Sequence, residues 1–188
     1  MEELKVVRGK NSRNIESFKN IIKLFEQEGY VVSYKLLKAS NYGVAQDRER
    51  VFVVGYHKSI GKKYEFPVQL EQKKTLRDVI WDLRTLKTPS SKVTNHEYST
   101  SSFSPIYMSR NRVRNWEQPS FTILATERHI PLHPGAPKMI KKTTDEWAFD
   151  ESKIKSYRRL TVRECARIQD FPDEYQFVYD NIIHGYKM

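Results

Sequence analysis

The sequence has 188 residues, 38% of them hydrophobic, a formal net charge of +10, a pI of about 9.6 and a mean hydropathy of −0.70. This length allows one domain, or a small domain with part of another, and no apolar run approaches the roughly 20 residues of a membrane span. The single cysteine, Cys165, excludes an internal disulfide framework. We therefore expect a soluble cytoplasmic protein whose basic charge favours phosphate-bearing partners.

Apolar residues recur at helical spacing near the start of the chain: Ile15, Phe18, Ile22 and Phe25. Gly29 follows them as a helix stop, so the pattern predicts a helix over 14–28. Aromatic and β-branched residues then predict strands over 30–37 and 51–56, the second of them more fully buried.

A turn at 41–43 separates the two predicted strands. Helix, strand, turn and strand together indicate the last part of an α/β sheet, ending in an antiparallel pair. A complete α/β domain needs more strands, and an isolated two-stranded sheet is marginally stable. We therefore expect an apolar sheet edge that pairs with something outside this sequence.

The central part of the chain has little periodicity. Residues 59–102 are rich in linker and loop signals, with one short helix expected over 75–83. Between 103 and 149, short β-favouring pieces alternate with prolines, which predicts a loop-rich, mostly-β region. Thr161-Val-Arg-Glu164 then forms a capping box, and the helix it starts should end near Gln169, before Phe171-Pro172.

The basic charge is concentrated in two segments. Residues 104–142 hold seven Lys or Arg against two Glu, and residues 153–167 hold six against one. Arg110, Arg112 and Arg114 alternate, so on an extended segment they would share one face. Arginine suits bidentate contact with phosphate or guanine, although a solvated run of charge is equally consistent with this feature.

Alternation also marks the motif at 41–50, which stands directly before the second predicted strand. Gln46, Arg48 and Arg50 would converge on one side of a strand entrance, with Asp47 and Glu49 on the other. Three converging donors suit phosphate oxygens or a pyrimidine carbonyl that gains charge during attack. Alternating charges on a solvated strand edge would give the same pattern.

Tyr-Gly-x-x-Gln-x-Arg-x-Arg, placed after a helix and strand and before an apolar strand, resembles a block of DNA (cytosine-5) methyltransferases. The resemblance implies that Gln46 and Arg48 help to hold the catalytic site together. It also implies that Arg50 contacts O2 of the flipped cytosine. The family usually has proline where this sequence has Ala45.

A second block, 157–173, is similar to the late motif of the same family over its full length. The resemblance assigns its helix to organising the DNA-reading part of the enzyme. We expect structural roles for four of its residues: Thr161, Arg163, Glu164 and Arg167. A phosphate contact by Arg158 or Arg159 is left open.

Together the two blocks imply four segments: the last helix and strands of a catalytic domain (1–58), a linker (59–84), a target-recognition domain (85–155), and the capped helix with the lead-in to a final motif (156–188). The implied fold is α/β plus mostly-β. It consists of the edge of a partial Rossmann-like sheet, as in S-adenosylmethionine-dependent methyltransferases, followed by a small, loop-rich target-recognition domain. Expected DNA contacts are Arg110, Arg112, Arg114, Ser120, Thr122, Arg128 and His129.

Other parts of the family pattern are not found in the sequence. They are the Pro-Cys loop with the nucleophile, the Glu-Asn-Val segment, the early glycine-rich turn for S-adenosylmethionine and the closing Gly-Asn-Ala-Val-Pro segment. Cys165 lies inside the capped helix and is expected to be a small packing residue. Without nearby thiolates, His129 and His133 predict no metal site.

The resemblance therefore implies a bacterial, nucleoid-associated part of a restriction–modification methyltransferase. We expect the chain by itself to be inactive and to bind double-stranded DNA as a partner. A complementary subunit would carry the thiol and most of the S-adenosylmethionine site. The alternative is a non-catalytic DNA-binding specificity domain or a decayed fragment.

Overall fold

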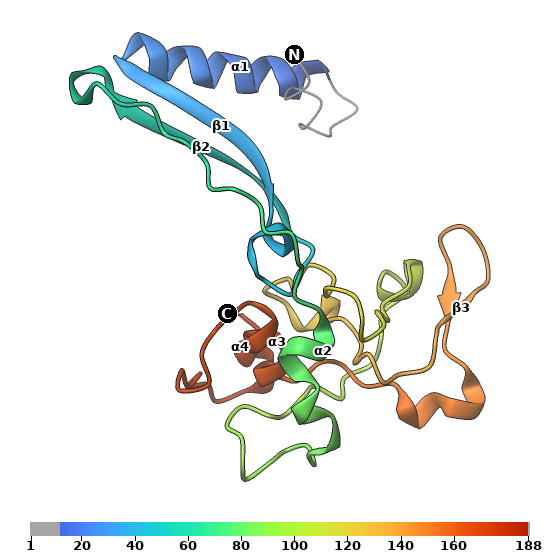
Figure 1. Ribbon diagram of the computed structural model, residues 1–188. Helices are drawn as coiled ribbons and strands as arrows, with labels where there is room; N and C mark the ends of the chain where they lie inside the picture. Colours follow the sequence, from blue (N-terminus) through green and yellow to red (C-terminus); the bar gives the residue numbers. More distant parts are fainter. Residues whose placement is uncertain (1–11, 188) are drawn as a thin grey trace. The chain divides into compact units, whose positions relative to one another are not determined.

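The computed structural model describes residues 12–187, which divide into two compact units (Figure 1). Unit 1 contains residues 12–38 and 49–69, and unit 2 contains residues 39–48 and 70–187. These units do not coincide with the four expected segments. No helix among the described residues has both the length and the apolar character needed to cross a membrane.

Unit 1 consists of a helix beside a two-stranded hairpin. Helix α1 (Ser12–Gln27) packs against strand β1 (Tyr30–Lys38), which pairs antiparallel with β2 (Glu49–His57) from Tyr30↔His57 to Lys38↔Glu49. Gly29 turns the chain between helix and strand with a φ of +87°, a conformation that favours glycine. The expected helix, both strands and their antiparallel pairing are thus confirmed.

The burial expected for the second strand is wrong. Val51, Phe52 and Val53 on β2 are 39–49% exposed. Within unit 1 as described, β2 has a strand partner on one side only, and a single helix packs on the hairpin. Ile22 is the one large apolar residue of the described part of unit 1 that is buried, so this unit has little core of its own.

Unit 2 contains short elements joined by long loops. Its α-helices are α2 (Leu76–Ile80), α3 (Val162–Ile168) and α4 (Ile182–Gly185). Helix α2 begins at a capping box between Thr75 and Asp78 and packs against α3. A 3-10 helix (Asp82–Thr85) follows α2. The helix expected over 75–83 is therefore confirmed, in two consecutive pieces.

Two clusters of buried residues form the interior of unit 2. The larger contains residues of α2 and α3, of the segments between them and of the end of α4: Leu76, Ile80, Leu83, Ile123, Ile130, Leu160, Val162, Cys165, Ile168 and Tyr186. The smaller contains Tyr107, Leu132, Ala136, Met139 and Tyr157. Residues 70–84, expected to be part of a linker, thus contribute three residues to the core.

Regular β structure in unit 2 is scarcer than the sequence suggests. The strands described there are β3 (Ile140–Lys141) and β4 (Trp147–Ala148), an antiparallel pair of two residues each. Isolated bridges add a few more pairings. The expectation of a loop-rich region is met, but "mostly β" is wrong, because prolines at 105, 119, 131, 134 and 137 interrupt the segments and cannot donate to a ladder.

Candidate nucleic-acid interface

The motif at 41–50 is divided between the two units, with its last two residues in unit 1. Gln46, in unit 2, is only 2% exposed. Its side-chain Oε1 accepts a hydrogen bond from the backbone N–H of Ile123 at 3.2 Å, and its backbone forms a parallel bridge with Ser120. Gln46 therefore anchors the segment 120–123, which belongs to the predicted recognition region.

The two following residues contact the same segment. The backbone N–H of Asp47 donates to the carbonyl of Ser120 at 2.8 Å, and its carbonyl accepts from the hydroxyl of Thr122 at 2.6 Å. A guanidinium nitrogen of Arg48, Nη1, donates to the carbonyl of Ile123 at 3.3 Å. Three consecutive motif residues thus fix the position of a segment more than 70 residues away in the sequence.

The carboxylate of Asp47 has a role that the sequence reasoning missed. It accepts a hydrogen bond from the hydroxyl of Ser40 at 2.9 Å and forms an ion pair with Arg114 at 3.2 Å. The Arg114 guanidinium also stacks over the ring of Phe121, 4.2 Å from its centroid. The sequence signal that could have indicated this ion pair is the position of the acidic Asp47 within a motif of basic residues.

The three alternating arginines do not share one face. Arg110 is exposed, Arg114 is half-buried in its ion pair, and Arg112 is only 6% exposed. Arg112 donates to the carbonyls of Tyr107 at 2.8 Å and Ile106 at 3.2 Å. Because its guanidinium is buried on backbone carbonyls, we assign Arg112 a structural role in place of the expected DNA contact.

The remaining expected DNA contacts also differ in accessibility. Ser120 is 1% exposed, and the Thr122 hydroxyl is occupied by the Asp47 carbonyl. Arg128 is exposed, and His129 is half-buried beside it; both line one cavity. Arg110, Arg128 and His129 therefore remain accessible as possible contacts, whereas Ser120 and Thr122 serve to hold the segment in place.

Arg50 lies on β2 of unit 1, opposite Leu37 in the ladder. Its side chain is exposed, and Nη1 donates to the carbonyl of its neighbour Glu49 at 2.7 Å. The guanidinium is not engaged with a carboxylate among the residues described. The contact with a cytosine that the resemblance implies stays a prediction.

The capping box at the start of α3 is confirmed. The Thr161 hydroxyl accepts from the N–H of Glu164 at 3.0 Å, and the Glu164 carboxylate accepts from the N–H of Thr161 at 2.8 Å. Arg158 donates two further hydrogen bonds of 2.8 Å to the same carboxylate. Burial raises the pKa of Glu164, but the hydrogen bonds and charge of Arg158 outweigh burial and hold the pKa below its usual value.

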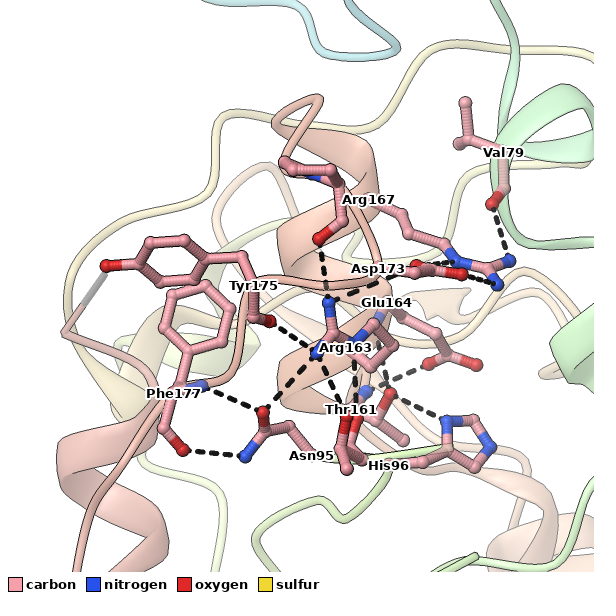
Figure 2. Close-up of polar contacts among 12 residues, drawn as sticks. Val79, Asn95, His96, Thr161, Arg163, Glu164, Arg167, Asp173, Tyr175 and Phe177 are labelled. Carbon is pink, nitrogen blue, oxygen red and sulfur yellow. Dashed lines mark hydrogen bonds and ion pairs between the residues drawn. The ribbon is translucent and has the colours of Figure 1, made fainter. Parts of the chain in front are cut away.

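The arginines of α3 tie this helix to the surrounding loops, as Figure 2 shows. Arg163 is fully buried and donates to the carbonyls of Thr94 at 3.1 Å, Pro172 at 3.2 Å and Tyr175 at 2.7 Å. Arg167 forms ion pairs with Asp82 at 2.8 Å and Asp173 at 2.6 Å. The expected structural roles of these residues agree with these contacts.

Arg158 and Arg159 are both engaged inside unit 2. Arg159 is 2% exposed and donates to three backbone carbonyls of one loop, those of Ser99, Ser101 and Ser102, at 2.7–3.2 Å. Arg158 is committed to the buried carboxylate of Glu164. The Arg159 guanidinium is therefore too buried to reach a phosphate, whereas a phosphate contact by Arg158, whose side chain is 18% exposed, stays a prediction.

His133 is buried next to the same carboxylate, with its Nε2 3.7 Å from a Glu164 oxygen. Burial lowers the pKa of His133 to about 4, against an ordinary value of 6.5. Its Nδ1 accepts a hydrogen bond from the N–H of Gly135 at 3.0 Å. The ring is therefore neutral at physiological pH, and within residues 12–187 no group of three His, Cys, Asp or Glu could hold a metal ion.

This environment predicts acid sensitivity of unit 2. Between pH 6.5 and about 4, the unfolded chain protonates His133 while the folded chain does not, so stability is lost as pH falls through this window. The free energy of unfolding should drop by about 2 kcal/mol between pH 7 and pH 5 from this group. Urea unfolding followed by tryptophan fluorescence measures it, because Trp81, Trp116 and Trp147 all lie in unit 2.

His133→Gln should flatten this pH dependence, and the exposed His184→Gln serves as its matched control. An unchanged pH slope in His133→Gln would show that the buried ring is not its source.

Cys165, on α3, is fully buried within the larger core cluster. Burial, with a smaller contribution from the nearby Glu164 carboxylate, raises the pKa of its thiol well above the usual value. A nucleophilic cysteine needs an accessible thiolate with a lowered pKa. The prediction that Cys165 is a packing residue is confirmed.

The sequence matches the family model described as C-5 cytosine-specific DNA methylase over residues 1–188. Among curated proteins, it is 51% identical over 184 residues to the Type II methyltransferase M.MthTI of Methanothermobacter thermautotrophicus, covering 93% of this chain and 56% of that protein. It is 50% identical to M.FnuDI of Fusobacterium nucleatum, covering 95% and 56%. The chain thus spans little more than half the length of these relatives.

Solved structures show a similar fold at low sequence identity. The methyltransferase EhMeth of Entamoeba histolytica superposes with a TM-score of 0.59 at 15% identity, over 90% of this chain and 51% of that one. A prophage-encoded DNA modification methyltransferase from E. coli gives a TM-score of 0.55 at 18% identity, over 96% and 60%. The fold is the mixed α/β fold of methyltransferases, and the chain belongs to the family of C-5 cytosine-specific DNA methylases.

Proposed function

We propose that this chain is the DNA-reading portion of a cytosine-5 DNA methyltransferase of a restriction–modification system. In this proposal it supplies Arg50 to the target cytosine and the segments that select the sequence around it. The thiol nucleophile, its acid partner and most of the S-adenosylmethionine site come from outside these 188 residues. They lie on a second polypeptide or on a further portion of the same protein.

The state of Cys165 carries this proposal. Addition to C6 of cytosine requires a thiolate, and this sequence contains a single cysteine. That cysteine is fully buried among apolar side chains, with its pKa raised by burial. No thiolate suited to the attack is therefore available from these residues.

The residues present also do not fit a complete cofactor site. S-adenosylmethionine is expected on a glycine-rich turn between a strand and the N-terminus of a helix. The sequence has no Gly-x-Gly, and the described glycines with positive φ lie at 29, 43 and 61, none of them in a turn from a strand into an α-helix. We therefore derive no reaction step through the cofactor from this chain.

Charge supports the DNA-reading role. Within residues 104–142, five basic residues are exposed and form no ion pair with a described carboxylate: Arg110, Arg128, Lys138, Lys141 and Lys142. Such unpaired cations favour association with phosphates through release of counterions. The buried Arg112 instead holds the segment that carries Arg110, so positioning and contact are divided between different residues.

Unit 1 supports the requirement for a further portion. It exposes a set of large apolar side chains on its helix and hairpin: Ile21, Leu24, Phe25, Val51, Phe52 and Val53. A two-stranded sheet with one helix buries too little apolar surface to be stable by itself. A covering segment that continues the sheet would remove this surface from water and stabilise the unit.

The test is reconstitution. The purified chain is mixed with the product of the adjacent upstream reading frame, and transfer of labelled methyl groups to double-stranded DNA is measured. We expect transfer in the mixture and none from either polypeptide alone, with DNA binding by this chain that weakens steeply with salt. An inactive mixture, or a neighbouring product without a Pro-Cys loop, would favour a non-catalytic specificity domain.

A further inference from the structure

A cavity of about 450 Å³ opens in unit 2 where the loop at 101–104 meets the 3-10 helix Glu127–His129. The residues that line it are Ser101, Ser102, Ser104, Ile106, Glu127, Arg128 and His129. The cavity thus combines a carboxylate, a guanidinium and an imidazole in a region rich in basic charge.

Glu127 is only 7% exposed, and its two carboxylate oxygens have different environments. Oε1 accepts hydrogen bonds from the hydroxyls of both Ser99 and Ser101. Oε2 has no hydrogen-bond partner among the residues described. Burial raises the pKa of Glu127, but the two hydroxyls outweigh this effect and lower it, so the group is ionised at neutral pH and presents one free acceptor oxygen.

His129 also lines this cavity. Its Nδ1 is buried and has no hydrogen-bond partner within the described part of the chain. Burial, together with the neighbouring arginines, lowers the pKa of the ring. The buried Nδ1 is closed to a ligand, so the carboxylate carries the argument: a Glu127 oxygen without a partner among the described residues, on a residue that lines a cavity, can accept a hydrogen bond from outside the chain.

A carboxylate at this position works against simple phosphate binding. It repels the DNA backbone, so it lowers affinity for any sequence, and a neutral amide would serve the two serine hydroxyls equally well. A buried negative charge beside the exposed Arg128 is therefore consistent with a discriminating group. Specific binding often combines favourable contacts with the correct DNA sequence and unfavourable contacts with other sequences, and a carboxylate can supply the unfavourable contacts.

The hydrogen-bonding groups on the base edges indicate which base the Glu127 carboxylate can recognise. In the major groove, a carboxylate accepts a hydrogen bond from the N4 amino group of cytosine, whereas adenine presents both a donor and an acceptor and pairs with the amide of Asn or Gln. Glu127 offers an acceptor and no donor. Its carboxylate is held by the hydroxyls of Ser99 and Ser101.

We propose that Glu127 is a specificity-determining residue, whose Oε2 accepts a hydrogen bond from the N4 amino group of a cytosine in the recognised sequence. This inference rests on the proposed DNA-reading function. In the bound state, Arg128, which is exposed and lines the cavity, would contact a neighbouring phosphate or guanine. The hydroxyls of Ser99 and Ser101 would keep the Glu127 carboxylate in place.

The experiment is selection of bound sequences from a randomised double-stranded DNA library by the full 188-residue chain. Wild type, Glu127→Gln and Glu174→Gln are compared, the last being an exposed acidic residue outside the cavity. At one position we expect Glu127→Gln to lose about tenfold of the preference for cytosine and to gain preference for adenine. Preferences at the other positions should be unchanged, and Glu174→Gln should match wild type throughout.

A second measurement needs no variant. A selected duplex with 2-pyrimidinone in place of that cytosine lacks the N4 amino group, and wild type should bind it about tenfold more weakly. Undiminished binding, or a Glu127→Gln selection identical to wild type, overturns the role of Glu127 alone. A wild-type chain that binds DNA without any sequence preference overturns the proposed DNA-reading function itself.

Discussion

Replacing Glu164 with alanine is expected to lower the free energy of unfolding of unit 2 by about 3–5 kcal/mol. The carboxylate is fully buried and receives hydrogen bonds from Arg158 and from the backbone of Thr161. Its removal leaves a partly buried guanidinium unpaired and takes away the helix cap. Because a domain is stable by only about 5–15 kcal/mol, this single change should remove a large share of the total.

Urea unfolding followed by tryptophan fluorescence measures the loss, with the exposed Glu174→Ala as control. Glu164→Gln, which keeps the size and one acceptor but not the charge, should lie between wild type and alanine. The double variant Arg158→Met, Glu164→Leu should recover much of the stability, since no charge is then left without its partner. A loss below about 1 kcal/mol in Glu164→Ala would contradict the importance of this pair.

Arg50→Ala is expected to reduce the rate of methyl transfer by the reconstituted enzyme about 100- to 1000-fold. A guanidinium that donates to the O2 atom of cytosine stabilises the charge that develops there when the thiolate adds. The effect should fall on kcat. The affinity for DNA should change little, because it depends mainly on phosphate contacts made by other residues. Folding should be unaffected, since the side chain is exposed and bonds only to a neighbouring carbonyl.

Single-turnover methylation assays with the reconstituted enzyme separate the chemical step from binding. Arg50→Lys should recover part of the rate, because the charge returns without the planar fork of donors. Lys58→Ala, an exposed cation that directly follows the same strand, should retain the wild-type rate. Turnover by Arg50→Ala at a rate close to wild type would contradict a catalytic contact.

Local patterns in the sequence were sufficient for the elements that depend on neighbouring residues. The capping box of α3 joins residues three positions apart, and the hairpin of unit 1 follows from two apolar strands with a turn between them. The burial of Cys165 was predicted from its place inside the capped helix. Each of these outcomes is decided by hydrogen bonds and periodicity within about 30 residues.

Long-range packing decided the rest, and arginine shows why. The sequence treats Arg110, Arg112 and Arg159 as equivalent cations, but only the first is exposed. The other two are buried because the fold places backbone carbonyls against their guanidinium groups. For Arg159 these carbonyls belong to a loop 57 to 60 residues earlier, and for Arg112 they belong to Ile106 and Tyr107. Where those carbonyls lie depends on the path of the loops, which the sequence does not encode locally.

The sequence by itself determined the family, the absence of a second cysteine and the start of the organising helix. Only the tertiary structure decided which polar side chains hold other segments in place and which remain accessible to a ligand. Gln46 and Arg48 reach Ile123 across more than 70 residues, and Glu127 keeps one oxygen free because two serine hydroxyls take the other. A side chain's role here depends on how many of its hydrogen bonds the fold already satisfies, and only the folded chain shows that number.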